Sequence, residues 1–219
     1  MSSENVKLTP LVVSTGLISC VATALMAWVF VVTEAPIAAA QQKKNTAALS
    51  QVLPAFDNRP TQEAVTLGDV TFYTARKDGQ ITGFAGETVT HKGYAGEVCV
   101  LAGLKPDGTL TTVLVTRQSE TPGLGTVVAE RVRQKTLSGI LAGKKETGLP
   151  PNKILDQFTG MKAEAGQTPW AVKKDGGDLD AIIGATITSR AVGGAVFTIA
   201  ETFAAQRATL LTGNTGSKD

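Results

Sequence analysis

The sequence is poor in residues that commonly hold metals. It contains two cysteines and one histidine. Cys20 lies in an apolar run and Cys99 in a strand-like run, so the two are poor partners for a disulfide. Without a Cys-x-x-Cys pair or a Cys/His cluster, zinc, haem and iron–sulfur sites are not expected on this chain. An electron carrier bound here would therefore have to be organic.

Aromatic residues and excess charge are also scarce. Phe, Trp and Tyr make up 5% of the sequence, and the formal net charge is +2, with Lys and Arg spread along the chain. Surfaces that bind nucleic acid combine a basic stripe with aromatic platforms, so we expect no nucleic acid partner. The 219 residues, 42% of them apolar, indicate one domain with an appendage.

No charged residue occurs between Lys7 and Glu34. The densest apolar part, residues 11–32, is long enough to cross a hydrocarbon core of about 30 Å at about 1.5 Å per residue. We favour an uncleaved transmembrane helix preceded by residues 1–10. A cleaved signal peptide is the alternative, because Ala38–Ala40 has the A-x-A pattern of a cleavage site. Lysines flank both ends of the segment, so charge alone does not determine its orientation.

The region after this segment predicts a stalk and then a sheet. Residues 37–53 are typical of a helix that ends before Pro54, within a stalk or linker over residues 33–64. Two Asp-Gly turns between β-branched runs predict two hairpins. Their strands are expected at residues 70–75, 80–90, 97–104 and 109–116. Both faces of the third strand are apolar, which predicts a covered sheet with Cys99 as a small core residue.

The remaining segments predict helices around that sheet. Residues 126–142 have apolar positions near helical spacing, and residues 153–158 form a short mixed segment. Residues 188–211 predict the last long helix. Its apolar face would consist of Val192, Ala195, Val196, Ile199 and Phe203. The fold class predicted is α+β, with one domain over residues 65–211 and a fraying tail over residues 212–219.

Residues 180–189 concentrate what a phosphate-bearing ligand needs at the start of a helix. The stretch offers two small residues and three hydroxyls: Gly184, Ala185, Thr186, Thr188 and Ser189. Free N–H groups of the first turn and the helix dipole favour negative charge there. An ordinary N-cap with additional threonines is the alternative interpretation.

A second block, residues 120–125, predicts a rigid turn that a ligand can approach closely. Its candidate cofactor-binding residues are Glu120, Thr121, Gly123 and Leu124. Glu120 would accept a hydrogen bond from a sugar-like hydroxyl, or the block is a surface turn without a ligand.

Together the two blocks resemble the motifs of a known family. Asp180–Thr186 resembles the Asp-x-x-(Ser/Thr)-Gly-Ala-Thr flavinylation motif, and Glu120–Gly125 resembles the other hallmark loop of the FMN-binding domain. The chain is similar to the G subunit of Rnf-type ion-translocating electron-transport complexes, a family related to the C subunit of the sodium-pumping NADH:quinone reductase. It departs from the pattern at Ile183, where the motif usually carries Ser or Thr, and at Gln118, where many relatives carry a histidine.

The resemblance implies a covalent cofactor. A flavin transferase would attach FMN to Thr186 through a phosphoester, with Thr188, Ser189 and the backbone amides around the remaining phosphate oxygens. Asp180 would belong to the signature recognised during attachment and would not touch the phosphate, since like charges repel. No catalytic acid, base or metal ligand on this chain is implied.

The resemblance also implies a location and partners. The N-terminus would be cytoplasmic, and the domain would lie on the periplasmic side of a bacterial inner membrane. The chain would relay electrons among other membrane and redox subunits in a complex that moves Na⁺ or H⁺, as an electron-transfer subunit and not a complete enzyme. Two alternatives stay open: an anchored anion- or partner-binding module without a redox role, and the C subunit of a sodium-pumping reductase. We expect Lys173, Lys174 and Arg190 to be solvated or to face the flavin or its phosphate. His91 is expected in an exposed loop.

Overall fold

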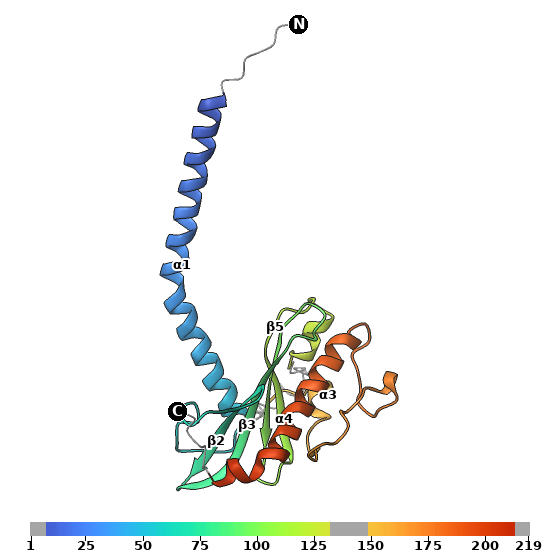
Figure 1. The fold of residues 1–219 in the computed structure, drawn as a ribbon. Coiled ribbons are helices and arrows are strands. Elements are labelled where there is room, and N and C mark those ends of the chain that lie inside the picture. Colours follow the sequence, from blue (N-terminus) through green and yellow to red (C-terminus); the bar gives the residue numbers. More distant parts are fainter. Residues whose placement is uncertain (1–7, 132–148, 213–219) are drawn as a thin grey trace, which may run out of the picture. The chain divides into compact units, whose positions relative to one another are not determined.

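The computed structural model describes residues 8–131 and 149–212 of the chain. The chain divides into two units, Met1–Asn45 and Thr46–Asp219. The described part of the first unit is helical, and the second contains a sheet with further helices (Figure 1).

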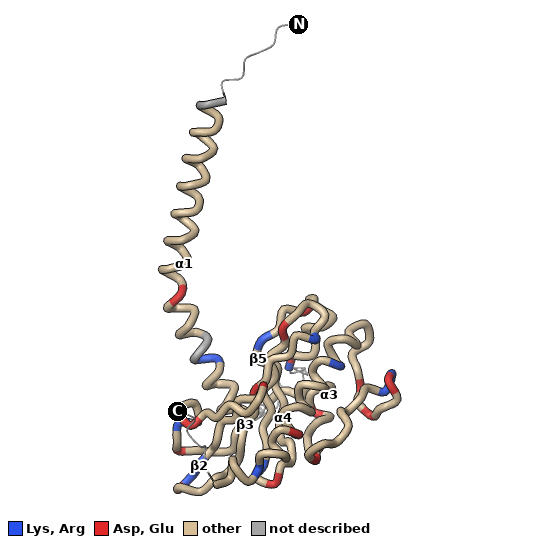
Figure 2. The backbone as a smooth tube through the Cα atoms, viewed as in Figure 1, with Lys and Arg blue, Asp and Glu red and all other residues tan. Residues whose placement is uncertain are grey.

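The first helix, α1, runs from Leu8 to Val52 without a break. It joins the two predicted helical segments, residues 11–32 and 37–53. Pro36 lies between them, inside the helix. A proline lacks one backbone N–H donor, and the helix continues past it. From Pro10 the helix is long and apolar enough to cross a membrane. Figure 2 shows how few charged residues it carries.

The second unit is built on one antiparallel sheet in the order β1-β2-β3-β4-β5. Its strands are Val65–Leu67, Val70–Lys77, Gln80–Thr90, Val98–Leu104 and Leu110–Gln118. Both predicted hairpins are confirmed, with strand ends within two residues of those expected. Asp78 and Gly79 turn the first hairpin with φ values of 53° and 77°, the left-handed pair that a two-residue hairpin turn requires. The short β1 was not predicted.

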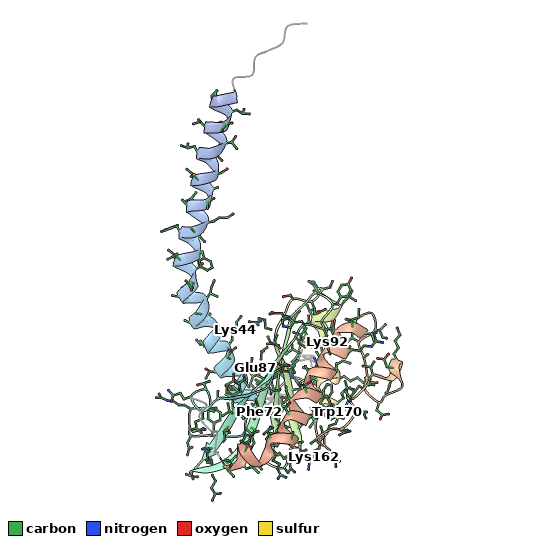
Figure 3. All side chains as sticks on the ribbon, in the orientation of Figure 1. Lys44, Phe72, Glu87, Lys92, Lys162 and Trp170 are labelled. Atoms are coloured by element: carbon green, nitrogen blue, oxygen red, sulfur yellow. The ribbon has the colours of Figure 1, made fainter. Side chains whose placement is uncertain are left out.

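One face of the sheet packs against the last helix, α4, which spans Thr186–Thr212. Its predicted apolar face is confirmed, because all five of those residues are buried. Phe203 packs its ring 5.1 Å from that of Phe84 and 6.0 Å from that of Phe72, which Figure 3 labels. A Cβ on Gly86 would lie 2.4 Å from Ile199 Cγ2, so this glycine lets the helix approach the sheet closely.

The opposite face of the sheet holds a smaller apolar cluster. It consists of Leu49, Val52, Leu53, Ala75, Ala85 and Leu101. The strand β4 is buried along its whole length, as its apolar faces predicted. Burial also raises the pKa of the Cys99 thiol, and the residue is 4% exposed, so its predicted place in the core is confirmed. The hairpins and flanking helices confirm the α+β class.

Short elements complete the second unit. They are the 3-10 helix η1 at Gly125–Val128, the helix α3 at Lys153–Asp156 and the 3-10 helix η2 at Lys173–Asp175. The predicted helix over residues 126–142 is wrong at residues 129–131, which form a turn and irregular chain after η1. Residues 132–148 lie outside the described residues. The predicted tail also lies outside them, except for Thr212, which ends α4.

Asn152 ties these short elements together. Its side-chain oxygen accepts hydrogen bonds from Ile154 N and Leu155 N, which caps α3. Its amide nitrogen donates to the carbonyl oxygens of Val127, Val128 and Glu130. The end of η1 is therefore fixed to the start of α3.

Candidate functional site

The second unit carries a pocket of about 680 Å³ beside the start of α4. This volume lies within the range typical of small-molecule and cofactor sites. Four segments supply its lining: the loop 93–96, the loop 120–125, η2 and the first turns of α4. The lining residues are Tyr94, Glu120, Thr121, Leu124, Gly125, Lys174, Gly184, Ala185, Thr186, Ile187, Thr188 and Arg190.

The start of α4 presents unpaired backbone donors to this pocket. Gly184 turns the chain with a φ of 84°, and Ala185 N donates to Ile182 O at 3.0 Å. The first helical hydrogen bond runs from Ser189 N to Ala185 O at 3.1 Å. The N–H groups of residues 186–188 precede that bond, so the helix itself gives them no partner. Their orientation and the helix dipole favour an anion at Thr186.

Ser189 does not line the pocket, although its hydroxyl was predicted to contact a phosphate. The residue is 4% exposed. Its Oγ donates to Ala185 O and accepts from Ile182 N, both at 3.0 Å. The hydroxyl therefore holds the turn that leads into α4.

Glu120 lies in the wall of the pocket and is 5% exposed. Its Oε2 accepts a hydrogen bond from Thr188 Oγ1 at 2.8 Å, and its Oε1 accepts one from Ala95 N at 3.2 Å. Both carboxylate oxygens and the Thr188 hydroxyl are thus engaged inside the protein. The predicted bond from Glu120 to a ligand hydroxyl stays a prediction, since a carboxylate can accept more than two hydrogen bonds.

Some of the other residues of the loop 120–125 line the pocket, and others do not. Thr121 and Leu124 line the pocket, whereas Gly123 lies outside its lining. Gly125 leaves room for the Glu120 side chain, because a Cβ there would lie 2.6 Å from Glu120 Oε2. Leu124 lies next to Gly184: a Cβ added to this glycine would lie 3.4 Å from Leu124 Cδ2.

Two cations share the pocket lining with Thr186, namely Lys174 and Arg190. The Arg190 guanidinium is held by Asp175 in a two-pronged pair, with Nε–Oδ2 at 2.6 Å and Nη2–Oδ1 at 2.5 Å. This pair lowers the pKa of Asp175. Arginine has five N–H donors, so the pair leaves three for another acceptor.

Asp180 is placed outside the pocket lining. Its Oδ1 lies 2.6 Å from Lys173 Nζ and its Oδ2 lies 3.2 Å from Lys153 Nζ. The hydrogen bonds from Lys173 and then Lys153 lower the pKa of this carboxyl. Gln157 also fixes its backbone, accepting from Asp180 N and donating to Asp180 O.

Besides Ile187, sequence reasoning missed a second residue of the pocket lining, Tyr94. It is 70% exposed and lies between Gly93 and Gly96. An aromatic residue between glycines was the available signal in the sequence. His91 lies in an exposed position, as predicted, with Nδ1 3.7 Å from Glu97 Oε1.

The comparisons with known proteins agree with this geometry. A family model described as "FMN-binding domain" matches residues 93–201, a span that includes every residue of the pocket lining. The G subunit of the ion-translocating oxidoreductase complex of Vibrio cholerae serotype O1 (strain M66-2) is 34% identical over 80% of this chain and 79% of its own. The chain belongs to this family of G subunits. The family predicted from the two motifs is therefore confirmed.

Two other members of the G-subunit family are similarly close. The protein of Haemophilus influenzae (strain PittEE) is 35% identical over 81% of both chains. That of Cereibacter sphaeroides (strain ATCC 17029 / ATH 2.4.9) is 36% identical over 90% of this chain and 84% of its own. These matches extend beyond the FMN-binding domain.

Proposed function

We propose that the chain is a membrane-anchored flavoprotein subunit that carries FMN covalently on Thr186 Oγ1 and relays electrons within an ion-translocating complex. The observation that carries the proposal is the position of Thr186. This threonine ends the Asp180–Thr186 motif, begins α4 and lines the pocket. Membership of the G-subunit family and the match to the FMN-binding domain support the same cofactor.

The residues of the pocket fit a phosphate joined to Thr186. A phosphoester keeps a negative charge, which the unpaired N–H groups at the start of α4 would stabilise. Lys174 and Arg190 supply positive charge in the same lining. Ser189 would act indirectly, because its hydroxyl holds the turn before Thr186.

The remaining lining suits a flat ring system. Leu124 and Ile187 are each 46% exposed and Tyr94 is 70% exposed, and all three line the pocket. A bound aromatic ring would cover part of this apolar surface. Thr121 and Gly184 complete the surface that we assign to the cofactor.

Bound FMN would supply reversible electron uptake, so the chain itself needs no catalytic acid or base. The protein's part is to hold the cofactor and limit its reach to neighbouring subunits. One candidate membrane helix cannot enclose an ion path, so translocation of Na⁺ or H⁺ would require the other membrane subunits of the complex. A flavin transferase would be needed for maturation.

We propose that α1 anchors the chain in a bacterial inner membrane with the FMN-binding domain on the periplasmic side. The length and apolar character of α1 support an anchor. The side of the membrane follows from the family resemblance.

Intact-protein mass spectrometry tests the attachment. We expect the full chain, produced together with a flavin transferase, to carry the added mass of one FMN, and Thr186→Val to lack it. Thr212→Val, at the other end of α4, is the matched control and should be loaded like the unaltered chain. A loaded Thr186→Val chain would show that the attachment site is wrong.

A second candidate function is an anion-binding module without a redox role. The cations Lys174 and Arg190 in the pocket lining favour it, because they would hold any phosphate-bearing ligand. An unaltered chain of unmodified mass that nevertheless binds inorganic phosphate would support this alternative.

A further inference from the structure

The carboxylate of Glu120 is buried in the protein but forms no ion pair with any residue that the structure describes. It is 5% exposed, and none of the ion pairs found in residues 8–131 and 149–212 involves it. A buried carboxylate is costly unless hydrogen bonds satisfy it. Its two donors here are neutral: the Thr188 hydroxyl and the Ala95 amide.

These two hydrogen bonds join segments that are far apart in the sequence. Ala95 belongs to the loop 93–96, which carries Tyr94, and Thr188 lies in the first turn of α4. Glu120 itself begins the third segment, the loop 120–125. One side chain thus connects three of the four walls of the pocket.

Two glycines leave just enough room for this carboxylate. A Cβ on Gly93 would lie 2.5 Å from Glu120 Oε1, and a Cβ on Gly125 would lie 2.6 Å from Glu120 Oε2. Real Cβ atoms do not approach oxygen so closely. The Glu120 side chain therefore accounts for a glycine at position 125, and at position 93 it does so together with Gly96 O, which a Cβ would also meet at 2.5 Å. The close fit indicates a fixed position for Glu120.

Thr188 lines the same pocket as Thr186, but the two side chains have different directions. Thr186 and Thr188 are two residues apart in a helix, so their side chains leave it on different faces. The Thr188 hydroxyl donates to Glu120. The carboxylate lies at the N-terminal turn of α4, where the helix dipole stabilises an anion.

We propose that Glu120 is a positioning residue, which acts through Thr188 and Ala95 to hold the Tyr94 loop against the start of α4. Its carboxylate makes no contact with the flavin ring or the phosphate. The effect on FMN rests on the function proposed above, whereas the effect on the loop does not.

Hydrogen exchange in the full-length Thr186→Val chain, in detergent and without attached flavin, tests the connection directly. Glu120→Gln removes the charge and turns an N–H₂ group toward one of the two donors. We expect amide exchange in residues 93–97 to become on the order of tenfold faster, since a hydrogen bond to a charged group is lost. Thr188→Val should also speed exchange there, and Thr188→Ser should restore the rate. Glu97→Gln, an exposed glutamate next to the same loop, should change it little.

The flavin of the loaded chain provides a second measurement. We expect Glu120→Gln and Thr188→Val to shift the midpoint potential in the same direction, with Thr188→Ser close to the unaltered protein. A purely structural role would lower the unfolding temperature and leave the potential unchanged, which would overturn the proposal. If Glu120→Gln does not fold, the two Thr188 variants decide the question alone.

The outcomes separate the two proposals. If Glu120→Gln shifts the potential but leaves exchange in residues 93–97 unchanged, Glu120 contacts the flavin and the positioning role is wrong. If no chain carries flavin, the proposed function fails, while the exchange measurement still decides the role of Glu120.

Discussion

The two long helices, α1 and α4, are both rich in apolar residues, but these side chains are exposed in α1 and largely buried in α4. In α1, Leu25 is 57% exposed and Phe30 is 66% exposed; in α4, Ile199 and Phe203 are fully buried. The apolar residues of α4 recur on one face, which packs on the sheet, whereas those of α1 surround the helix. A helix that is apolar all round needs an apolar surrounding, as a membrane provides. The same residue types therefore stabilise the domain through α4 and suit α1 to the membrane anchor that we propose.

The largest expected effect comes from truncating the aromatic core of α4. Phe203→Ala removes a ring that packs against Phe72 and Phe84. We expect the free energy of unfolding of the domain to fall by about 3–5 kcal/mol, from lost burial and the cavity left behind. Phe30→Ala, the same change in α1, should leave the domain's urea unfolding curve unchanged. A loss below about 1 kcal/mol for Phe203→Ala would contradict the burial that the comparison depends on.

A smaller effect is expected from placing a charge in the middle of the apolar segment of α1, residues 11–32. Val21 is 53% exposed, and an arginine at the centre of a membrane helix costs about 2.5–3.5 kcal/mol of apparent insertion free energy. We predict that Val21→Arg lowers the fraction of the chain that stays with membranes after an alkaline wash, while Val21→Leu does not.

Equal retention of Val21→Arg and the unaltered chain would argue against α1 as the anchor. Sequencing the N-terminus of the membrane-bound chain addresses the remaining alternative. A mature chain that begins just after residue 40 would identify the segment as a cleaved signal peptide.

The smallest effect is expected at the polar turn that precedes α4. Lys173 and Lys153 hold the pKa of Asp180 below its ordinary value. The carboxylate therefore stabilises the folded chain above the pKa of the unfolded state, near about 3.9. This contribution is lost as the pH falls through the lower pKa of the folded state.

Asp180→Asn should slightly lower the unfolding temperature at pH 7 relative to the unaltered chain. The difference should shrink as the pH falls below about 4 and should weaken with added salt. Asp69→Asn, in the exposed turn between β1 and β2, is the control. A difference that persists unchanged in acid would contradict the role of the two lysines.

Local patterns predicted most of the fold. Both hairpins depend on Asp-Gly turns between neighbouring strands, and α4 depends on apolar residues at steps of three and four, so each is determined within a short stretch. The helix predicted from residue 126 was wrong at residues 129–131. There the chain turns toward Asn152, which donates to Glu130 O, and a contact with a residue so distant in sequence leaves no periodic signal.

The sequence indicated segments that line the pocket, but it did not indicate the side-chain contacts between them. The motifs indicated the loop 120–125 and the start of α4, and both segments line the pocket. They could not indicate that Glu120 accepts from Thr188, because these residues are 68 positions apart. They also could not show that Ser189 turns its hydroxyl into the preceding turn, since a hydroxyl near a helix start serves a ligand or the backbone equally well.

Fluorescence of the denatured chain on a gel tests the central claim most directly, because only a covalent flavin survives denaturation and separation. The chain produced together with a flavin transferase should fluoresce under ultraviolet light at its own position, and Thr186→Val should be dark. A dark band for the unaltered chain, or a fluorescent one for Thr186→Val, would contradict the account.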